Sequence, residues 1–496
     1  DPKIGTGGHG HVFVGANVPF GMVQVGPTSI PQEWDWVSGY HRSDSTVIGF
    51  SHTHLSGTGI GDLFDVTVMP VVGQVTYARG TEDDPSSGLW SYADRTREIA
   101  RPGYYSVPLT RYGITAEMTA TPRVGLHRYT FPASDAAAVV FDLENGGCWD
   151  KATDTGFRFS DDSTRIAGWR CSTGWAKNQE VYFVAEFSKP AKGISYLQPG
   201  EIDDSKMPRI AARYARVDFD TAEGEQVLVK VALSPVSIEG AKANLAAELP
   251  GWDFDATAAA ADKAWNDELS KVKIETEDET SKRIFYTALY HTMVAPSLFC
   301  DVNGDYRGAD GKVHENPGRD TYTTFSLWDT YRAAMPLMTV LHPERMPDII
   351  QTMLHIADEQ GRLPVWHLWG NETDCMVGNP GIPVVADAIV KGIEGFDREK
   401  AFEAIRKTAM DPGRGNGLRM EHGYIPCDLF NEAVAYDMEY ALADGAAARA
   451  AEALGKAEDA KYFEERSHSY RNYFDPATRF MRGLSLIHIS EPTRRS

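Results

Sequence analysis

The pattern of apolar residues changes near residue 238, and this change constrains the fold more than any other feature of the sequence. Up to Ser237, short alternating or β-branched runs recur, and Gly, Pro, Asn and Asp separate them. Examples are DVTVMPVVGQVTYA, GLHRYTFP, AAVVFDL, VYFVAEF and EQVLVKVAL. Many strands in one block, with no amphipathic helix between them, predict an antiparallel β-sandwich rather than a parallel α/β sheet.

After Ile238 the spacing of apolar residues is that of helices. The Ala-rich segment FDATAAAADKAWNDELSKV predicts a linker helix. In the next helix Ile284 and Ala288, and likewise Phe285 and Leu289, lie four residues apart on one predicted face. Further helices are predicted in SLWDTYRAAMPLMTVL, ERMPDIIQTMLHIADEQ, PVVADAIVKGIEGF, REKAFEAIRKTAM, NEAVAYDMEYALADG, AAARAAEALG and AEDAKYFEERSHSYRNYF.

Helices joined in short hairpins indicate an α/α toroid or a solenoid, and the absence of a fixed short repeat argues against the simple solenoid. About eight or nine helices are fewer than the twelve of a closed six-hairpin barrel, so we predict an incomplete (α/α)6 toroid. The predicted domains are a β-sandwich over residues 1–237, a linker helix region over 238–272 and the first part of the barrel over 273–484. The segment 485–496 departs from the preceding pattern and is interpreted as a non-native, adapter-like tail, with a genuine short tail as the alternative.

Composition and charge exclude several kinds of partner. The net charge of −21, with no basic patch, argues against nucleic-acid binding. No apolar run reaches the roughly 18 residues that a membrane-spanning helix needs. The five cysteines are widely spaced without a CxxC motif, so they predict no disulfide framework.

The stretch FSHTHLSGTGIGDLFD, residues 50–65, carries a pair of histidines, His52 and His54. In an extended segment both imidazoles would point to one side, as zinc ligands could, and His9 and His11 form a second such pair. No HExxH motif or Cys/His knuckle accompanies them. We therefore favour imidazoles that hydrogen-bond to loop carbonyls or to a bound polar ligand over a zinc site.

The same stretch contains a Gly-rich run, SGTGIGDL. It lacks the GK[ST] ending of a phosphate-binding P-loop, and Asp62 stands where a dinucleotide fingerprint has its third glycine. The glycines are therefore interpreted as a loop that brings the backbone close to another group.

Tryptophans gather with carboxylates and amides in QEWDWVSGYHRSD, TTFSLWDTYRAAMP and GRLPVWHLWGNETDC. Carbohydrate sites are commonly built this way, because aromatic rings pack on apolar sugar faces while carboxylates and amides bind hydroxyls. The alternative is structural: Trp328 in the core, Asp329 as a cap or a partner of Arg332, and Glu372 as an N-cap or a buried ion-pair partner. The candidate substrate-binding residues are Trp34, Asp35, Trp36, His52, His54, Trp328, Asp329, Asn371 and Glu372.

Four segments resemble glycoside hydrolase family 92, whose members are mostly bacterial exo-acting α-mannosidases. They are DPKIGTGGHGHVFVGANVPFGMVQVGP, WDWVSGYHRSDSTVIGFSHTHLSGTGIGDL, FSLWDTYRAAMPL and LPVWHLWGNETDCMVG, and the resemblance runs from Asp1 to about Arg482. It implies a β-sandwich packed on an (α/α)6 barrel with the active site between them, and calcium-dependent hydrolysis of α-mannosides with inversion. Inversion needs a general acid and a general base about 6.5–9.5 Å apart, and calcium would bind vicinal sugar hydroxyls.

The resemblance also implies that the chain ends before its catalytic residues. Family members run on for about 250 further residues, and the general acid, the general base and the calcium ligands are expected there. Glu372 is the alternative candidate for the general acid, because it is the most site-like carboxylate present. Asp329 is expected to accept a hydrogen bond from the terminal mannose, and Asn371 and Glu372 are the next candidates. The 50–62 stretch is expected to form or support the sandwich side of the sugar pocket, with contributions from Trp34, Asp35 and Trp36.

The implied partners are mannose-containing oligosaccharides or glycoproteins, with α-1,2 as the commonest linkage, and the implied location is periplasmic or secreted. Two alternatives stay open: a related sandwich-plus-toroid glycoside phosphorylase or hydrolase, and a non-catalytic mannose-binding fragment. A structural half-barrel without a ligand would instead expose apolar helix faces and aggregate.

Overall fold

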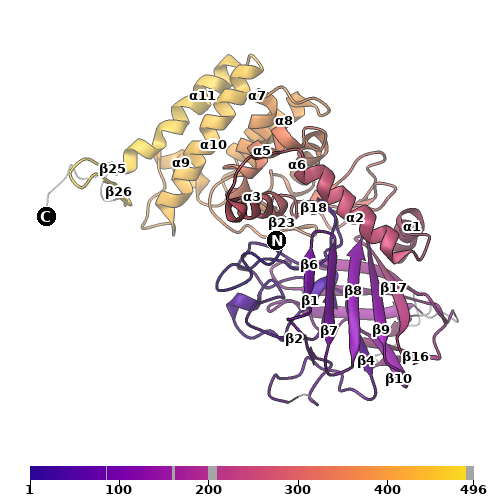
Figure 1. Ribbon diagram of the computed structural model, residues 1–496. Coiled ribbons are helices and arrows are strands. Elements are labelled where there is room, and N and C mark those ends of the chain that lie inside the picture. The colour runs from indigo at the N-terminus through magenta and orange to yellow at the C-terminus, as the bar shows by residue number, and fades with distance from the viewer. Residues whose placement is uncertain (85, 159–161, 199–208, 487–496) are drawn as a thin grey trace. The chain divides into compact units, whose positions relative to one another are not determined.

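The structure is a computed structural model and describes residues 1–84, 86–158, 162–198 and 209–486. It divides into two compact units, which are described separately (Figure 1). The first holds Asp1–Arg307 and Val313–Gly318, and the second holds Gly308–Lys312 and the chain from Arg319 onward. The predicted non-native tail lies outside the described residues, apart from Ser485 and Leu486.

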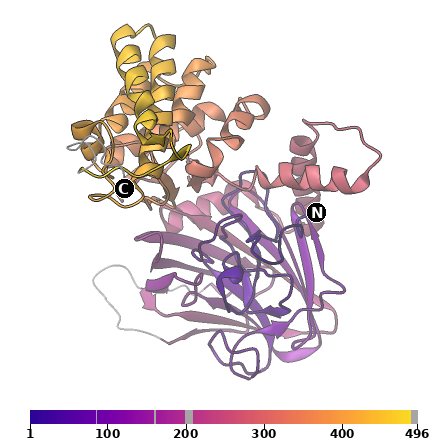
Figure 2. The ribbon, with the colours of Figure 1, turned by 90° about the vertical axis from the view of Figure 1, so that its left-hand side faces the viewer.

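The first unit is a β-sandwich of two antiparallel sheets (Figures 1 and 2). The six-stranded sheet has the order β1 (Gly26–Thr28), β3 (Gly49–Ser51), β4 (Thr67–Val72), β10 (Ser134–Asp142), β16 (Tyr214–Thr221) and β14 (Gly193–Leu197). The nine-stranded sheet has the order β15 (Arg209–Ala211), β11 (Lys151–Arg158), β12 (Arg165–Thr173), β13 (Gln179–Phe187), β17 (Glu225–Ser234), β9 (Val124–Phe131), β8 (Ile114–Ala120), β7 (Tyr104–Leu109) and β6 (Ile99–Arg101). The predicted antiparallel sandwich is therefore confirmed.

Side-chain alternation explains why the two sheets pack face to face. In β13 the buried and partly exposed residues alternate over much of the strand, as expected for a strand with one face in the core. Phe141 of β10 and Phe183 of β13 come from opposite sheets, are fully buried, and have parallel rings with centroids 6.0 Å apart. The short strands β2 (Thr46–Val47) and β5 (Ser91–Tyr92) pair at one side.

Helices α1 (Ile238–Glu248) and α2 (Phe254–Leu269) cover the outer face of the nine-stranded sheet. Each begins at a capping side chain, since Ser237 accepts a hydrogen bond from Gly240 N and Asp253 accepts one from Ala256 N. The apolar residues of both helices form one buried cluster with strands β9, β12, β13 and β17. The segment predicted as a linker helix is thus part of the packed core of the first unit.

Helix α3 (Glu279–His291) differs from the predicted amphipathic pattern. Leu289 is buried and Phe285 half-buried, as predicted, but Ile284 and Ala288 are exposed. The prediction of two pairs on one buried face is therefore wrong for Ile284 and Ala288, because only a narrow stripe of this helix packs against the unit. The short strands β18 (Ser297–Leu298), β19 (Tyr306–Arg307) and β20 (Val313–His314) follow.

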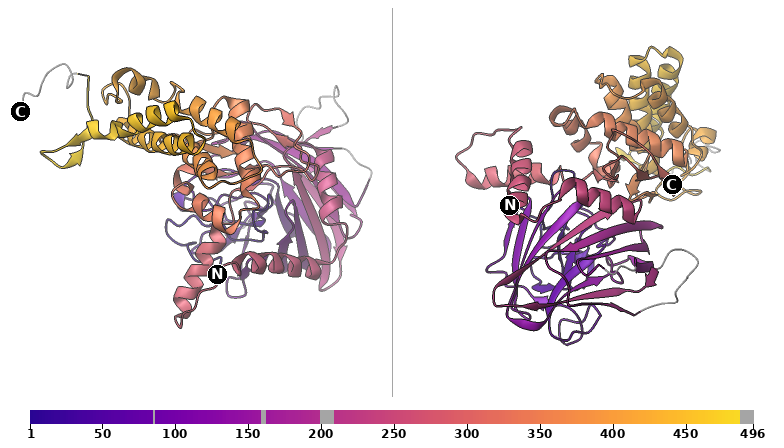
Figure 3. Two further views of the ribbon diagram at one scale, coloured as in Figure 1. Left: turned by 90° about the horizontal axis from the view of Figure 1, so that it is seen from above. Right: turned by 90° about the vertical axis from the view of Figure 1, so that its right-hand side faces the viewer.

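The second unit is mainly helical. Its elements are β21 (Tyr322–Thr323), β22 (Phe325–Ser326), α4 (Leu327–Thr330), α5 (Ala334–Leu341), α6 (Met346–Gln360), β23 (Trp366–Leu368), β24 (Asn371–Glu372), α7 (Gly381–Val390), α8 (Arg398–Ala409), α9 (Asn416–His422), α10 (Ala433–Ala453), α11 (Ala457–Ser467), the 3-10 helix η2 (His468–Tyr473), β25 (Phe474–Asp475) and β26 (Phe480–Met481). Helix α10 packs against α7, α8 and α11, and Figure 3 shows the yellow α10 and α11 side by side.

Two predicted helix boundaries in this unit are wrong. The segment SLWDTYRAAMPLMTVL forms two helices, α4 and α5, because Pro336 has no N–H and its ring would clash with the carbonyl of Arg332 in a continuous helix. Conversely, the two helices predicted on either side of Gly445 are the single helix α10. An isolated glycine costs a helix only about 1 kcal/mol, which the buried alanines of α10 offset. No helix among the described residues is long and apolar enough to cross a membrane.

Candidate functional site

A buried ion-pair network anchors the 50–65 stretch in the first unit. Arg170 has no exposed surface and donates from Nη1 to Asp65 Oδ1 (2.7 Å) and from Nη2 to Asp150. The second Asp65 oxygen accepts hydrogen bonds from Thr53 Oγ1 (2.7 Å) and Gln179 Nε2 (2.5 Å). Because an unpaired buried charge is very costly, this network fixes the end of the loop against strands β12 and β13.

His52 lies in the interior of the sandwich. Its Nδ1 donates to Val66 O (2.6 Å), so its Nε2 accepts from His127 Nε2 (2.9 Å), and His127 Nδ1 in turn accepts from the Tyr129 hydroxyl (2.8 Å). Burial lowers the pKa of His52 to about 4, so the imidazole is neutral at neutral pH. Both ring nitrogens are occupied, so this geometry does not favour the predicted contact of His52 with a substrate.

His54 has a similar environment. It is buried, its Nδ1 donates to Gln24 O (2.8 Å), and burial lowers its pKa to about 3. The sequence favoured imidazoles that hydrogen-bond to loop carbonyls, and both His52 and His54 form such a hydrogen bond. Neither presents a free nitrogen pair on one side, as a zinc site would require.

The Trp34-Asp35-Trp36 segment forms a 3-10 turn whose two tryptophans face different surroundings. Trp34 is half-exposed, and its Nε1 donates to Gly59 O (2.8 Å). Trp36 donates from Nε1 to Asp44 Oδ2 (2.6 Å) and stacks on the His41 ring, with centroids 4.4 Å apart. Trp34 is therefore the ring available to a ligand, while Trp36 supports the turn.

His9 and His11, which were not among the candidate substrate-binding residues, contact Trp34 and Asp35. Asp35 Oδ1 accepts a hydrogen bond from His9 Nδ1 (2.6 Å) and lies 3.4 Å from His11 Nε2. The His9 hydrogen bond lowers the pKa of Asp35. The His11 ring meets the Trp34 ring edge-on, with centroids 4.2 Å apart. The alternating pair in GHGH was the sequence signal for these residues, although it gave no indication of Asp35 as their partner.

Gly59 explains how the Gly-rich loop contributes to this surface. A Cβ at this position would lie 2.6 Å from Trp34 Cζ2, so any larger residue would displace the ring. The loop interpretation of SGTGIGDL, in which glycine allows close backbone approach, therefore describes the contact between Gly59 and Trp34. We call the cluster of His9, His11, Trp34, Asp35 and Gly59, in which His9 and Trp34 are exposed and His11 is buried, the tryptophan surface.

In the second unit, the sheet of β22, β23 and β24 brings the two other predicted clusters together. Ser326 pairs with Trp366, and Leu368 pairs with Asn371. Helix α4 begins directly after β22, so Trp328 and Asp329 emerge beside β23. Asp329 is exposed and accepts a hydrogen bond from Ser326 Oγ (2.5 Å).

Trp328 is half-buried beside Asp329, and the guanidinium of Arg332 lies 4.7 Å from its ring centroid. Within the described residues, the buried Nε1 of Trp328 has no hydrogen-bond partner. A buried donor without a partner is uncommon, and a polar ligand would satisfy it. We call Trp328, Asp329, Asn371 and the loop 369–378 the barrel-side rim.

Glu372 has a structural role in this rim. Its carboxylate accepts backbone hydrogen bonds from Val365 N (2.8 Å), Trp366 N (2.9 Å) and Asp374 N (3.0 Å), and one from Gln360 Nε2 (3.3 Å). These four hydrogen bonds occupy both carboxylate oxygens, whereas a general acid needs an oxygen that reaches the leaving group of the substrate. Neighbouring Asn371 donates from Nδ2 to Trp369 O (2.8 Å).

The backbone of the rim is unusual, because several residues other than glycine have positive φ angles. They are Thr324 (63°), Trp369 (46°), Asp374 (54°) and Met376 (74°). Such conformations cost of order 1–3 kcal/mol each and concentrate at functional sites. Arg414 holds this loop by donating from Nη1 to Gly378 O (2.5 Å) and from Nη2 to Met376 O. The strain supports the rim as a candidate site, and no feature of the sequence indicated these backbone conformations.

Comparisons with known proteins match almost the whole chain. The glycosyl hydrolase family 92 N-terminal domain matches residues 1–234, and the catalytic domain of the same family matches residues 240–486. A family GH92 alpha-mannosidase from Bacteroides thetaiotaomicron is 38% identical over 98% of this chain, with a TM-score of 0.93, and this chain covers 67% of that one.

Two more distant relatives agree. A family GH92 inverting mannosidase from Bacteroides thetaiotaomicron is 28% identical over 96% of this chain and 64% of its own length, with a TM-score of 0.83. An uncharacterized secreted glycosidase of Arthroderma benhamiae is 26% identical over 96% of this chain and 62% of its own length. The chain thus spans between 62% and 67% of the length of these relatives.

Proposed function

Because the chain belongs to glycosyl hydrolase family 92, we propose that its activity is the hydrolysis of terminal α-linked mannose in glycans, with inversion at the anomeric carbon. The observation that carries this proposal is the 38% identity over 98% of the chain to an alpha-mannosidase, at a TM-score of 0.93. The relative with 28% identity is an inverting mannosidase, which supports the proposed stereochemistry. The proposed substrates are mannose-containing oligosaccharides or glycoproteins, and the proposed linkage is α-1,2.

The tryptophan surface fits one face of a sugar. The half-exposed Trp34 ring offers an apolar platform, and Asp35 beside it accepts hydrogen bonds from hydroxyl groups. His9, with a largely exposed side chain, can donate or accept at the same edge. We assign substrate contact to Trp34 and Asp35, and a supporting role to Trp36.

The barrel-side rim offers a second set of polar groups. Asp329 is an exposed acceptor, and the unpartnered Nε1 of Trp328 is a donor. We propose that Asp329 accepts a hydrogen bond from a mannose hydroxyl, with Asn371 beside it. Glu372 holds the loop through its backbone hydrogen bonds, and we do not assign it the role of general acid.

Calcium is the cofactor that the family suggests, and Ca²⁺ takes 6–8 oxygen ligands. Asp329 offers one exposed carboxylate at the rim, and the Glu372 oxygens are occupied by N–H donors. These residues do not form a calcium site by themselves, so we derive no step through the metal. The proposed location, outside the cytoplasm, has the support of the secreted fungal relative.

Release of mannose from α-1,2-mannobiose tests the proposed function. The sample is this chain, first with added calcium and then with EDTA. Release that EDTA abolishes is expected from the proposal. A requirement for phosphate with formation of mannose 1-phosphate would instead indicate a phosphorylase, and binding of mannobiose without turnover would indicate a carbohydrate-binding protein.

A further inference from the structure

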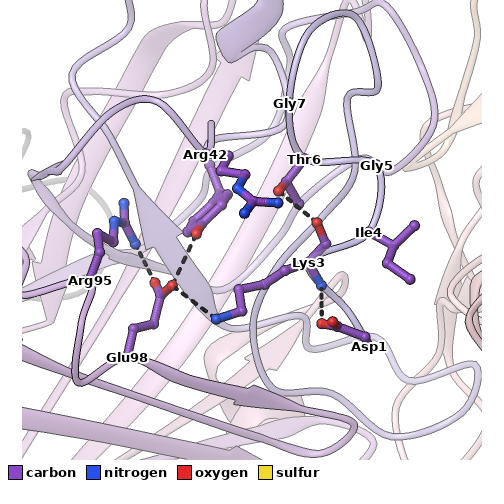
Figure 4. Close-up of a pocket in the computed structure, with 10 residues that line it drawn as sticks. Asp1, Lys3, Ile4, Gly5, Thr6, Gly7, Arg42, Arg95 and Glu98 are labelled. Atoms are coloured by element: carbon purple, nitrogen blue, oxygen red, sulfur yellow. Dashed lines mark hydrogen bonds and ion pairs between the residues drawn. The ribbon is translucent and has the colours of Figure 1, made fainter. Parts of the chain in front are cut away.

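A pocket of about 680 Å³ lies in the first unit, between the N-terminal loop and the segments around residues 42 and 95 (Figure 4). Lys3, Thr6, Tyr40, Arg42, Arg95 and Glu98 contribute to its lining. Among all the lining side chains, three are cationic (Lys3, Arg42 and Arg95) and two are anionic (Asp1 and Glu98). This local excess of positive charge contrasts with the net charge of −21 for the whole chain.

Of the two anionic side chains of this pocket, Asp1 accepts a hydrogen bond from the backbone N–H of Lys3 (3.1 Å), and Glu98 is already fully neutralised. Its side chain is 2% exposed, and it accepts hydrogen bonds from the hydroxyls of Tyr40 (3.0 Å) and Tyr105 (2.6 Å). Arg95 forms an ion pair with it, and Lys3 Nζ lies 3.7 Å from its Oε2. Glu98 therefore cannot also neutralise a further cation in the pocket.

Arg42 is that further cation. Its side chain is exposed, and no acceptor or ion-pair partner for its guanidinium occurs in the part of the chain that the structure describes. Figure 4 shows the guanidinium pointing toward the loop that carries Thr6, with no interaction drawn to it. Its backbone is fixed, because Arg42 N donates to Thr6 O (2.9 Å). The guanidinium of Arg42 is therefore available to an anion in the pocket.

The loop opposite Arg42 has a conformation that the sequence GTGG makes possible. Gly5 has a φ angle of 90°, and a Cβ there would also lie 2.8 Å from Val12 Cγ2, so this position requires glycine. Thr6 Oγ1 donates to Lys3 O (2.8 Å) and closes the turn. The turn places Lys3, whose side chain is 36% exposed, on the same pocket as Arg42.

We propose that this pocket binds a tetrahedral oxyanion, a phosphate or sulfate group, through Arg42 and Lys3. A guanidinium donates two parallel hydrogen bonds to such a group, and an ammonium adds a point charge. The pocket is large enough for the oxyanion together with part of a molecule that carries it. The proposal uses side chains from Lys3 onward and does not depend on the mannosidase activity.

Calorimetric titration of the chain with inorganic phosphate, inorganic sulfate and glycerol 3-phosphate tests the proposal. Sodium acetate and sodium chloride at matched ionic strength are the control ligands, because screening alone acts equally on all of them. We expect phosphate or sulfate to bind with a Kd of about 1 mM or tighter, and acetate at least about tenfold more weakly. Tighter binding of glycerol 3-phosphate than of phosphate would identify an ester as the preferred form, and equal binding the free ion.

Variants separate the pocket from general surface charge. Arg42→Ala is expected to weaken phosphate binding about tenfold or more, and Arg42→Lys to weaken it less. Arg97→Ala removes a nearby exposed arginine that does not line the pocket, and it should leave binding unchanged. An unchanged thermal midpoint of Arg42→Ala shows that the fold is intact. Wild-type affinity in Arg42→Ala, equal binding of acetate, or no binding of either oxyanion at about 20 mM would overturn the proposal.

Discussion

Replacement of Glu372 by glutamine distinguishes a structural carboxylate from a general acid. The side chain keeps its size, but one carboxylate oxygen becomes an NH₂ group. In the structure Oε1 accepts from Trp366 N and Asp374 N, and Oε2 accepts from Val365 N and Gln360 Nε2. In either amide orientation, the NH₂ group must face at least one backbone N–H donor.

The cost follows from these contacts. One or two backbone N–H groups lose their acceptor, at about 1–3 kcal/mol for each buried donor left unsatisfied. The remaining hydrogen bonds lose the charge assistance that makes them roughly twice as strong as neutral ones. We expect Glu372→Gln to lower the local stability of the 365–374 hairpin by about 2–4 kcal/mol.

Amide hydrogen exchange of the peptide that covers residues 363–375 measures this change directly. A loss of 2–4 kcal/mol corresponds to exchange through local opening that is roughly 30 to 1,000 times faster. Asp329→Asn is the matched control, because this exposed carboxylate accepts one side-chain hydrogen bond and its loss should cost less than about 1 kcal/mol. Unchanged protection in Glu372→Gln, together with a large loss of mannoside hydrolysis, would refute the structural role and restore Glu372 as the candidate acid.

Three further predictions concern the first unit. Burial raises the pKa of Asp62 to about 7 from an ordinary value of 3.8. The protonated carboxyl therefore contributes to the free energy of unfolding in full below about pH 4, and this contribution is lost as pH rises through 7. In urea unfolding, Asp62→Asn should therefore be more stable than the parent at pH 8, by up to roughly 4 kcal/mol, and equal to it at pH 4; an equal difference at both pH values would contradict this. Arg170→Met leaves two buried carboxylates without their cation and should lower the free energy of unfolding by about 3–5 kcal/mol, and a loss below 1 kcal/mol would show that the network is dispensable. Trp34→Ala should weaken mannobiose binding about 3- to 10-fold by titration calorimetry, whereas the exposed Tyr92→Ala should not, and equal effects of both would remove Trp34 from the site.

The sequence predicted the sandwich because its strands carry their own pattern. Alternating burial in β13 and the turn residues between strands are local features, so they are visible without the fold. The helical unit was predicted for the same reason, with boundary errors at Pro336 and Gly445. Both errors come from a balance between local propensity and packing that a sequence pattern does not resolve.

The candidate site was only partly predictable. Adjacency in the sequence placed Trp34, Asp35 and Trp36 together, but their different surroundings depend on contacts with Gly59 and Asp44. The link between His9 and Asp35 joins residues that are 26 positions apart. No sequence rule marks such a contact, because it is created by the folding of two loops onto each other.

The histidines and Glu372 illustrate a second limit. In the sequence, His52 resembles a residue that binds a metal ion or a substrate. In the structure its side chain is buried inside the sandwich, and burial keeps the imidazole neutral. Likewise, the function of Glu372 depends on three backbone N–H groups that converge only in the folded hairpin. The positive φ angle of Thr324 is equally invisible, since sequence rules associate this conformation with glycine and asparagine.

The configuration of the first-formed mannose tests the central claim most directly. Proton NMR in the first minutes of α-1,2-mannobiose hydrolysis, before mutarotation, distinguishes the β-anomer from the α-anomer. We expect β-mannose, formed by a single displacement with water. α-Mannose as the first product would contradict inversion, and no release of mannose from any α-mannobiose would contradict the proposed activity itself.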